Sequence, residues 1–104
     1  MEYKVLLTKE AEIDLDNIIK YILFEKKNKE AAESIMNDFS EIIQKLSHSA
    51  GSFKLCDNLR LKELGYRRLN FSKHDYFILY RIQQNNVFID KIFHFKQDYE
   101  NKIK

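Results

Sequence analysis

The hydrophobic residues follow a helical period in the first half of the chain and a strand period in the second half. A short apolar run at residues 3–7 precedes Thr8, which predicts a strand that ends where a helix begins. From residue 9 to about residue 25, apolar residues recur every three or four positions, and this spacing predicts a helix. Thr8 is a suitable cap because its hydroxyl can accept a hydrogen bond from a free amide of the first turn.

A second helix is predicted over about residues 29–47, after the polar stretch "KKNK" interrupts the first one. Asn28 is a suitable cap for it. Its apolar positions are separated alternately by three and four residues, which gives a narrow stripe suited to packing on another helix. These positions are Ala32, Ile35, Phe39, Ile42 and Leu46. Because the connection is short, the two helices should form an antiparallel αα-hairpin.

The second half of the chain predicts a loop followed by three strands. Residues 47–58 are expected to form the loop, with Gly51 at its turn. Strands are expected at about 64–71, 75–82 and 87–95. The middle strand is apolar on both faces, so it should be a central strand that is covered on both sides. The turn "QQNN" should join the last two strands, with Asn85 and Asn86 able to adopt positive φ.

These elements predict the α+β class. We expect an N-terminal strand, an antiparallel αα-hairpin and a three-stranded antiparallel meander. The four strands should form one antiparallel sheet, with the helices on one face. With 104 residues, of which 44% are apolar, the chain fits a single domain over residues 1–104.

Composition excludes several classes of protein. No apolar run is long enough to span a bilayer, and the N-terminus does not resemble a secretory signal. The single cysteine, Cys56, cannot form an internal disulfide, so we expect a cytoplasmic protein with no membrane association. Metal-binding spacing, a Gly-rich phosphate loop and a nucleophile motif are all lacking, so no metal or cofactor is expected and Cys56 is expected to be inert.

Charge is unevenly distributed. Residues 1–50 carry 7 Lys and Arg against 10 Asp and Glu, whereas residues 51–104 carry 11 against 6. The resulting net charges of −3 and +5 suggest a basic face in the second half, although a mixed solvated surface has the same signature. Eight of these basic residues are Arg60, Lys62, Arg67, Arg68, Lys73, Arg81, Lys91 and Lys96.

Aromatic residues are interleaved with these cations: Tyr66, Phe71, Tyr76, Phe77, Phe93, Phe95 and Tyr99. Cations that neutralise phosphate beside rings that stack on bases are typical of RNA-binding sheets. Rings at strand spacing more often belong to the core, and that alternative stays open. Our candidates for binding nucleic acid or another target are Arg60, Lys62, Arg67, Arg68 and Tyr99. Arg67 and Arg68 should point to opposite faces.

One catalytic hypothesis fits these residues. RNA can be cut when its own 2′-hydroxyl attacks the adjacent phosphate, so a protein needs to supply only an acid, a base and cations. His94 is the candidate acid or base because its ordinary pKa is near neutrality. Arg81 and Lys96, with Arg67 or Arg68, are candidate phosphate ligands. A structural role for His94 at a strand end is the competing interpretation.

The chain resembles the RelE/ParE superfamily, the toxins of type II toxin–antitoxin modules. The resemblance rests on the order and spacing of "YKVLLTKEAEIDLDNIIKYI", "EAAESIMNDFSEIIQKL", "GYRRL", "DYFILYRI" and "IDKIFHFKQDYE". It covers nearly the whole chain and implies the same fold. It also implies a cognate antitoxin from the same operon, which would lay a helix on the hairpin or add a strand to a sheet edge.

The resemblance leaves three functions open. RelE-like members cut mRNA in the ribosome, and ParE-like members poison DNA gyrase without cutting RNA. The chain resembles the ParE side more, because its hairpin is long and Phe77 stands where RelE-like nucleases commonly have an arginine. The ending after His94 also resembles ParE-like members. We therefore expect a gyrase inhibitor, with a ribosome-dependent mRNA endoribonuclease as the alternative and a non-toxic antitoxin-binding protein as the third hypothesis.

Overall fold

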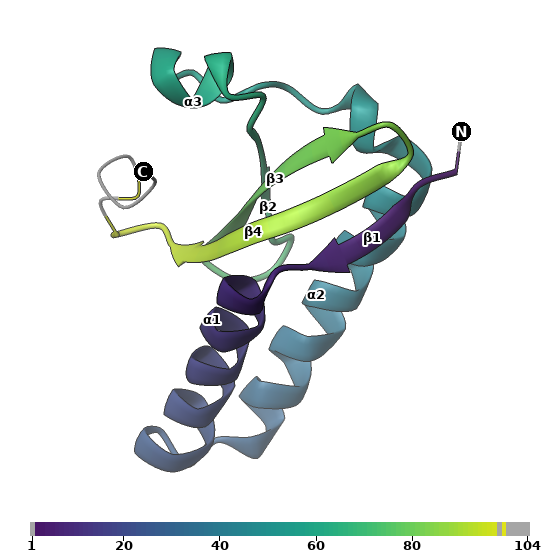
Figure 1. The fold of residues 1–104 in the computed structure, drawn as a ribbon. Helices are drawn as coiled ribbons and strands as arrows, with labels where there is room; N and C mark the ends of the chain where they lie inside the picture. The colour runs from purple at the N-terminus through teal and green to yellow at the C-terminus, as the bar shows by residue number, and fades with distance from the viewer. Residues whose placement is uncertain (1, 98, 100–104) are drawn as a thin grey trace.

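A four-stranded sheet organises the part of the chain that the computed structural model describes, which is residues 2–97 and residue 99 (Figure 1). The strand order is β1-β4-β3-β2. Its strands are β1 (Lys4–Leu7), β2 (Arg67–Asn70), β3 (Tyr76–Gln83) and β4 (Asn86–His94). The strands β2, β3 and β4 form the expected antiparallel meander, which confirms the fold class.

The N-terminal strand departs from the expectation of a wholly antiparallel sheet. β1 pairs with β4 in parallel, from Lys4 opposite Asn86 to Leu7 opposite Ile89. Parallel pairing requires a long crossover, and here three α-helices and two strands lie between the paired strands in sequence. The sequence of β1 therefore carries no local signal for its direction.

The two long helices lie on one side of the sheet as an antiparallel hairpin (Figure 1). α1 (Lys9–Lys20) continues into a π-helical turn, η1 (Tyr21–Glu25), and α2 (Lys29–Ser49) follows. Thr8 and Asn28 cap them as predicted, accepting hydrogen bonds from the amides of Ala11 at 3.2 Å and Ala31 at 3.0 Å. Both caps satisfy amides that have no partner within the helix.

The larger core lies between the hairpin and the sheet. The predicted stripe on α2 is buried throughout, and it packs with Ala11, Ile78, Tyr80 and Ile89. Tyr80 is fully buried, and its hydroxyl donates to the carbonyl of Ala50 at 2.8 Å. The hydrogen bond allows this polar group to be buried at little cost.

The opposite face of the sheet carries a second, smaller core. Phe77 and Leu79 of β3 and Phe93 of β4 are buried there beneath Cys56 and Leu61. Burial of β3 on both faces confirms the central-strand prediction. Phe77 and Phe93 are also buried there, so these two rings are core residues and not rings exposed for stacking on bases.

The segment before β2 is more structured than predicted. The residues expected to form a loop, 47–58, contain the last turn of α2 and the 3-10 turn η2 (Ala50–Ser52). The short helix α3 (Leu59–Glu63) lies between that loop and the predicted strand, where no element was expected, and β2 begins at Arg67. Asn58 caps α3 by accepting from the amide of Leu61 at 3.1 Å. Leu61 packs in the second core and so holds α3 against the sheet. A segment as short as α3 has too few residues to show this tertiary contact in its sequence.

The positions with positive φ differ from those predicted. Gly65 ends α3 with a φ of +86°, whereas Gly51 lies in η2. Between β3 and β4 it is Gln84 that adopts a positive φ of 56°, and neither Asn85 nor Asn86 does so. Positive φ at a two-residue hairpin turn gives a twist that matches that of the strands, which offsets the steric cost of a residue with a Cβ.

A buried carboxylate fixes the turn between β2 and β3 to the hairpin. Asp38 of α2 is 2% exposed and accepts hydrogen bonds from the amides of Ser72 at 3.0 Å and Lys73 at 2.9 Å. Its other contact is His74 Nδ1 at 2.8 Å, which must donate because the carboxylate can only accept. Burial acts to raise the pKa of Asp38, but the hydrogen bonds from His74, Lys73 and Ser72 outweigh it and hold the pKa below its ordinary value.

We expect Asp38→Asn to lower the free energy of unfolding at pH 7 by about 2 kcal/mol, because charge-assisted hydrogen bonds are replaced by neutral ones. The folded-state pKa lies below the unfolded-state value of about 3.9. The stabilisation is therefore complete above that value and is lost as the pH falls through the folded-state pKa. Chemical denaturation from pH 7 to pH 3 measures it, with Glu41→Gln as a matched control on the exposed side of α2. An equal loss at pH 7 and pH 3 would contradict this role.

Candidate functional site

The second face of the sheet presents an arginine stacked on aromatic rings. The guanidinium carbon of Arg68 lies 3.7 Å from the centroid of Phe77, 5.5 Å from Phe95 and 5.6 Å from Tyr99. Its Nε donates to Asn70 Oδ1 at 2.9 Å. Arg68 pairs with Leu79 in the sheet register, and Asn70 pairs with Phe77, so the backbone positions the guanidinium over the ring. These contacts hold the Arg68 side chain in one of the many rotamers that an arginine can adopt.

A hollow of about 420 Å³ lies beside this arginine. It is bordered by the segment before α3 and by β2, and its lining residues are Phe53, Lys54, Leu55, Cys56, Asp57, Arg68, Leu69, Asn70 and Tyr99. Lys54 and Asp57 form an exposed ion pair of 3.2 Å at its border. The thiol of Cys56 is buried. The hollow therefore combines an apolar floor with one guanidinium held in position.

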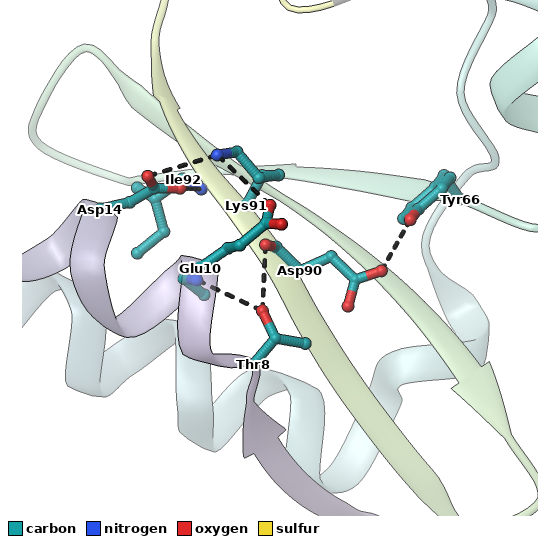
Figure 2. A network of polar contacts seen from close by, with 8 residues as sticks. Thr8, Glu10, Asp14, Tyr66, Asp90, Lys91 and Ile92 are labelled. Carbon is teal, nitrogen blue, oxygen red and sulfur yellow. Dashed lines mark hydrogen bonds and ion pairs between the residues drawn. The ribbon is translucent and has the colours of Figure 1, made fainter. Parts of the chain in front are cut away.

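A β-bulge in β4 places a carboxylate on the same face. Between Leu79 and Tyr80 the register shifts, because Leu79 pairs with Lys91 while Tyr80 pairs with Ile89, and Asp90 is left over. Asp90 Oδ2 accepts a hydrogen bond from the hydroxyl of Tyr66 at 2.7 Å (Figure 2). It also accepts one from Arg81 Nε at 2.8 Å. Arg81 also lies over the ring of Phe88 at 4.7 Å. A bulge re-aims side chains, and here it creates a polar cluster beside the second core.

The bulge is anchored to the start of α1 on its other side. Figure 2 shows Asp14 of α1 reaching β4, where it accepts from the amide of Ile92 at 2.9 Å and lies 3.4 Å from Lys91 Nζ. The hydroxyl of Thr8 donates to the carbonyl of Asp90 at 3.1 Å. The pairing of β1 with β4 ends at Ile89, and these contacts satisfy backbone groups of β4 beyond that point.

The polar cluster changes the acidity of its members. Burial and the hydrogen bond to Asp90 raise the pKa of Tyr66 to about 12. The hydrogen bond to Asp90 also raises the pKa of Arg81, because it favours the charged guanidinium. Arg81 is therefore held as a permanent cation whose charge Asp90 compensates.

The candidate acid or base lies away from this cluster. His94 pairs with Tyr76 at one end of the sheet, with the two rings 5.1 Å apart and perpendicular. Tyr76 packs with the hairpin core, whereas Arg81 is five residues further along β3, roughly 16 Å away, and points to the second face. The structure therefore does not bring His94 and Arg81 together.

His94 and Lys96 instead contact each other in the turn after β4. His94 Nδ1 accepts a hydrogen bond from the amide of Lys96 at 3.1 Å, and the His94 amide donates to Gln97 Oε1 at 2.8 Å. The Lys96 side chain is exposed. Both contacts are those of a residue that stabilises a turn, so the geometry agrees with the structural interpretation of His94.

The other candidates are dispersed. Arg67 and Arg68 point to opposite faces as predicted, and Arg67 pairs with Tyr80 and donates to the carbonyl of Phe53. Arg60 and Lys62 are exposed on α3. Of the five predicted binding residues, the structure brings together Arg68 and Tyr99.

Sequence reasoning did not identify Asp90, Tyr66 or Asp14 as members of a site. A signal for the first was present, because "VFIDKIF" changes phase. Val87 and Ile89 face the hairpin core, and so does Ile92, which shifts the alternation by one residue. Two adjacent charged residues in an apolar strand are a sign of a bulge.

Neither a metal site nor a membrane span is found among the described residues. No group of three or more His, Cys, Asp or Glu residues there is arranged to hold a metal ion. No helix in that part of the chain is long and apolar enough to cross a bilayer. The features that remain as a site are the Arg68 platform, its hollow and the cluster at Asp90.

Comparison with known proteins identifies relatives of this chain. The family described as "ParE toxin of type II toxin-antitoxin system, parDE" matches residues 5–99. Among solved structures, one described as "Chromosomal ParDE TA system from P. aeruginosa" is similar, with a TM-score of 0.71 and 20% sequence identity over 89% of this chain and 96% of that chain. At that identity the likeness concerns the fold. A search of curated proteins finds no match.

The Tyr66–Asp90 hydrogen bond predicts a loss of stability at alkaline pH. We expect Tyr66→Phe to lower the free energy of unfolding by about 1.5 kcal/mol at pH 8, the scale of a hydrogen bond to a charged group. The pKa of Tyr66 is raised from 10.0 to about 12. The stabilisation is therefore complete below the ordinary pKa of the unfolded chain and is lost as the pH rises through the folded-state value. Urea denaturation of both proteins between pH 8 and pH 11 measures this difference, and the exposed Tyr21→Phe is the control. A difference that stays constant to pH 11 would contradict the role of the hydroxyl.

Proposed function

This chain belongs to the ParE toxin family of type II toxin–antitoxin systems, and we propose that it arrests bacterial growth by inhibiting DNA gyrase, without catalysis of its own. In this proposal it acts in the cytoplasm, where gyrase is found, and is neutralised there by a cognate antitoxin. The family match over residues 5–99 supports the assignment as a toxin. The choice of gyrase as the target rests on the resemblance to ParE-like members and on the arrangement of polar side chains.

The observation that carries the proposal is the separation of His94 from Arg81, which leaves Lys96 as the candidate phosphate ligand in contact with His94. Cutting RNA without a metal requires the acid or base and the phosphate-binding cation to reach the same phosphodiester within a few ångströms. Here the two residues lie roughly 16 Å apart along β3 and β4 and on opposite faces. Arg81 is in addition bound to Asp90 at 2.8 Å. Catalysis at this position would first require the ion pair to break, which disfavours the endoribonuclease alternative.

Two lysines of the second half are compensated by carboxylates, which lowers the positive charge that they offer to an RNA backbone. Lys91 is paired with Asp14 and Glu10, and Lys54 is paired with Asp57. A nuclease that holds an RNA backbone requires several cations available to phosphates. Protein recognition through a few positioned side chains makes no such demand.

The purified protein should inhibit supercoiling of a relaxed plasmid by purified DNA gyrase, and cleaved DNA should accumulate. Binding to gyrase is sufficient for this effect, so His94→Ala/Lys96→Ala should retain the inhibition within about threefold. The double variant loses hydrogen bonds of the turn after β4, which should lower its free energy of unfolding by about 1 kcal/mol. Agarose gel electrophoresis measures supercoiled and linear DNA, and His48→Ala/Lys9→Ala is a matched control with two exposed side chains.

The endoribonuclease alternative makes the opposite prediction. If gyrase is unaffected, and if the toxin cuts mRNA in a ribosome-dependent translation reaction that His94→Ala/Lys96→Ala abolishes, the proposal is overturned. Thermal unfolding of the double variant shows whether it is folded in both assays.

A further inference from the structure

We propose that Arg68, fixed on its aromatic platform, receives one carboxylate from an extended segment of the antitoxin, seated in the hollow between residues 53–57 and β2. The inference rests on the proposed function, because that function supplies an antitoxin as the partner. It adds the residue that recognises the partner and the chemistry by which it does so.

The first step is that the internal contacts of Arg68 leave its terminal N–H donors unused. Its Nε is occupied by Asn70 at 2.9 Å, and the ring of Phe77 covers one side of the guanidinium plane at 3.7 Å. Within the described residues, no acceptor lies at hydrogen-bonding distance from the two terminal nitrogens. Two parallel N–H groups on a planar fork match the two oxygens of a carboxylate. Because the stacking already fixes the side chain, little rotamer entropy is lost when the carboxylate binds.

The second step is that the hollow adjoins an open strand edge. β2 is the last strand of the sheet, and residues 53–57 meet it at a single bridge, between Leu55 and Arg67. Past that bridge, Leu69 and Asn70 line the hollow. An extended peptide there can continue the sheet while its alternate side chains enter the hollow. The volume of about 420 Å³ accommodates a few side chains and excludes a folded domain.

The third step favours a carboxylate over nucleic-acid phosphates. Asp57 is on the border of the hollow, where its charge repels a polyanion. Lys54 is already paired with it at 3.2 Å, and Arg81 is paired with Asp90. Phe77 and Phe93 are 0% and 2% exposed, so neither ring offers a face on which a base can stack, whereas Phe95 of the platform is 43% exposed. The hollow carries little net charge and holds one guanidinium in a fixed position. It can therefore bind one acidic side chain through Arg68.

The test measures binding of the toxin to the antitoxin encoded beside it. We expect Arg68→Gln to weaken the affinity on the order of 100-fold, mainly through faster dissociation, as for other hydrogen-bonded charge pairs at interfaces. Arg68→Lys keeps the charge but loses the fork and should weaken it about tenfold. Lys4→Gln removes the same charge from the exposed edge at β1 and should change the affinity by less than about threefold, the effect of a rim charge. Surface plasmon resonance gives both rates.

A change made in the partner separates recognition from folding. Each Asp and Glu in the toxin-binding half of the antitoxin is replaced by its amide and measured against unaltered toxin and against Arg68→Gln. One replacement should weaken binding to the unaltered toxin and have little further effect on the variant, which is the signature of a direct pair in a double-mutant cycle. This half of the test requires no variant of the toxin to fold beyond Arg68→Gln, whose melting temperature is measured in parallel.

Each outcome bears on one of the two proposals. If the antitoxin does not bind or neutralise the protein at all, the proposed function fails. If it binds, and if Arg68→Gln matches Lys4→Gln or no acidic residue couples to Arg68, the inference about this site is overturned while the function stands. It is also overturned if Arg68→Gln leaves antitoxin affinity unchanged but removes binding to a single-stranded RNA oligonucleotide or to gyrase.

Discussion

Burial of β3 on both faces is the constraint on which the rest of the structure depends. Phe77 and Leu79 face one side and Ile78 and Tyr80 the other, and all four are fully buried. Each face must therefore be covered, by the helical hairpin on one side and by Leu61, Cys56 and Tyr99 on the other. Short segments with little structure of their own, such as α3, are ordered because apolar surface would otherwise meet water. The hollow beside Arg68 lies where this second cover ends.

The same constraint distributes the charges. A cation that projects from a two-sided central strand emerges beside a core, where an uncompensated charge is costly. Arg81 is compensated by Asp90, which the bulge in β4 turns toward it, and Lys91 is compensated by Asp14. Arg68 comes from the edge strand and is stabilised by ring faces instead of by a carboxylate. The central strand β3 therefore carries an ion-paired arginine, whereas the edge strand β2 carries one without a carboxylate partner among the described residues. The proposed recognition of the antitoxin depends on this difference.

Local patterns predicted the helices and strands well, whereas features that depend on pairing between distant segments could not be predicted. The stripe on α2, both helix caps and the central position of β3 followed from spacing and from single residues such as Thr8. The parallel pairing of β1 did not follow, because it joins residues more than 80 positions apart. The same limit applies to the candidate site. Cations and rings could be named in the sequence, yet only the register of β2 against β3 shows that Arg68 meets Phe77 while His94 is remote from Arg81.

Brief induction of the toxin in bacteria that lack the antitoxin tests the central claim most directly, when incorporation of labelled thymidine and of labelled amino acid is followed in parallel over the first minutes. Inhibition of gyrase predicts that DNA synthesis stops first while protein synthesis continues. If protein synthesis stops first, the target is translation and the account is wrong in its choice of gyrase. If both continue and the cells grow, the protein is not a toxin under those conditions and the account of its activity is contradicted as a whole.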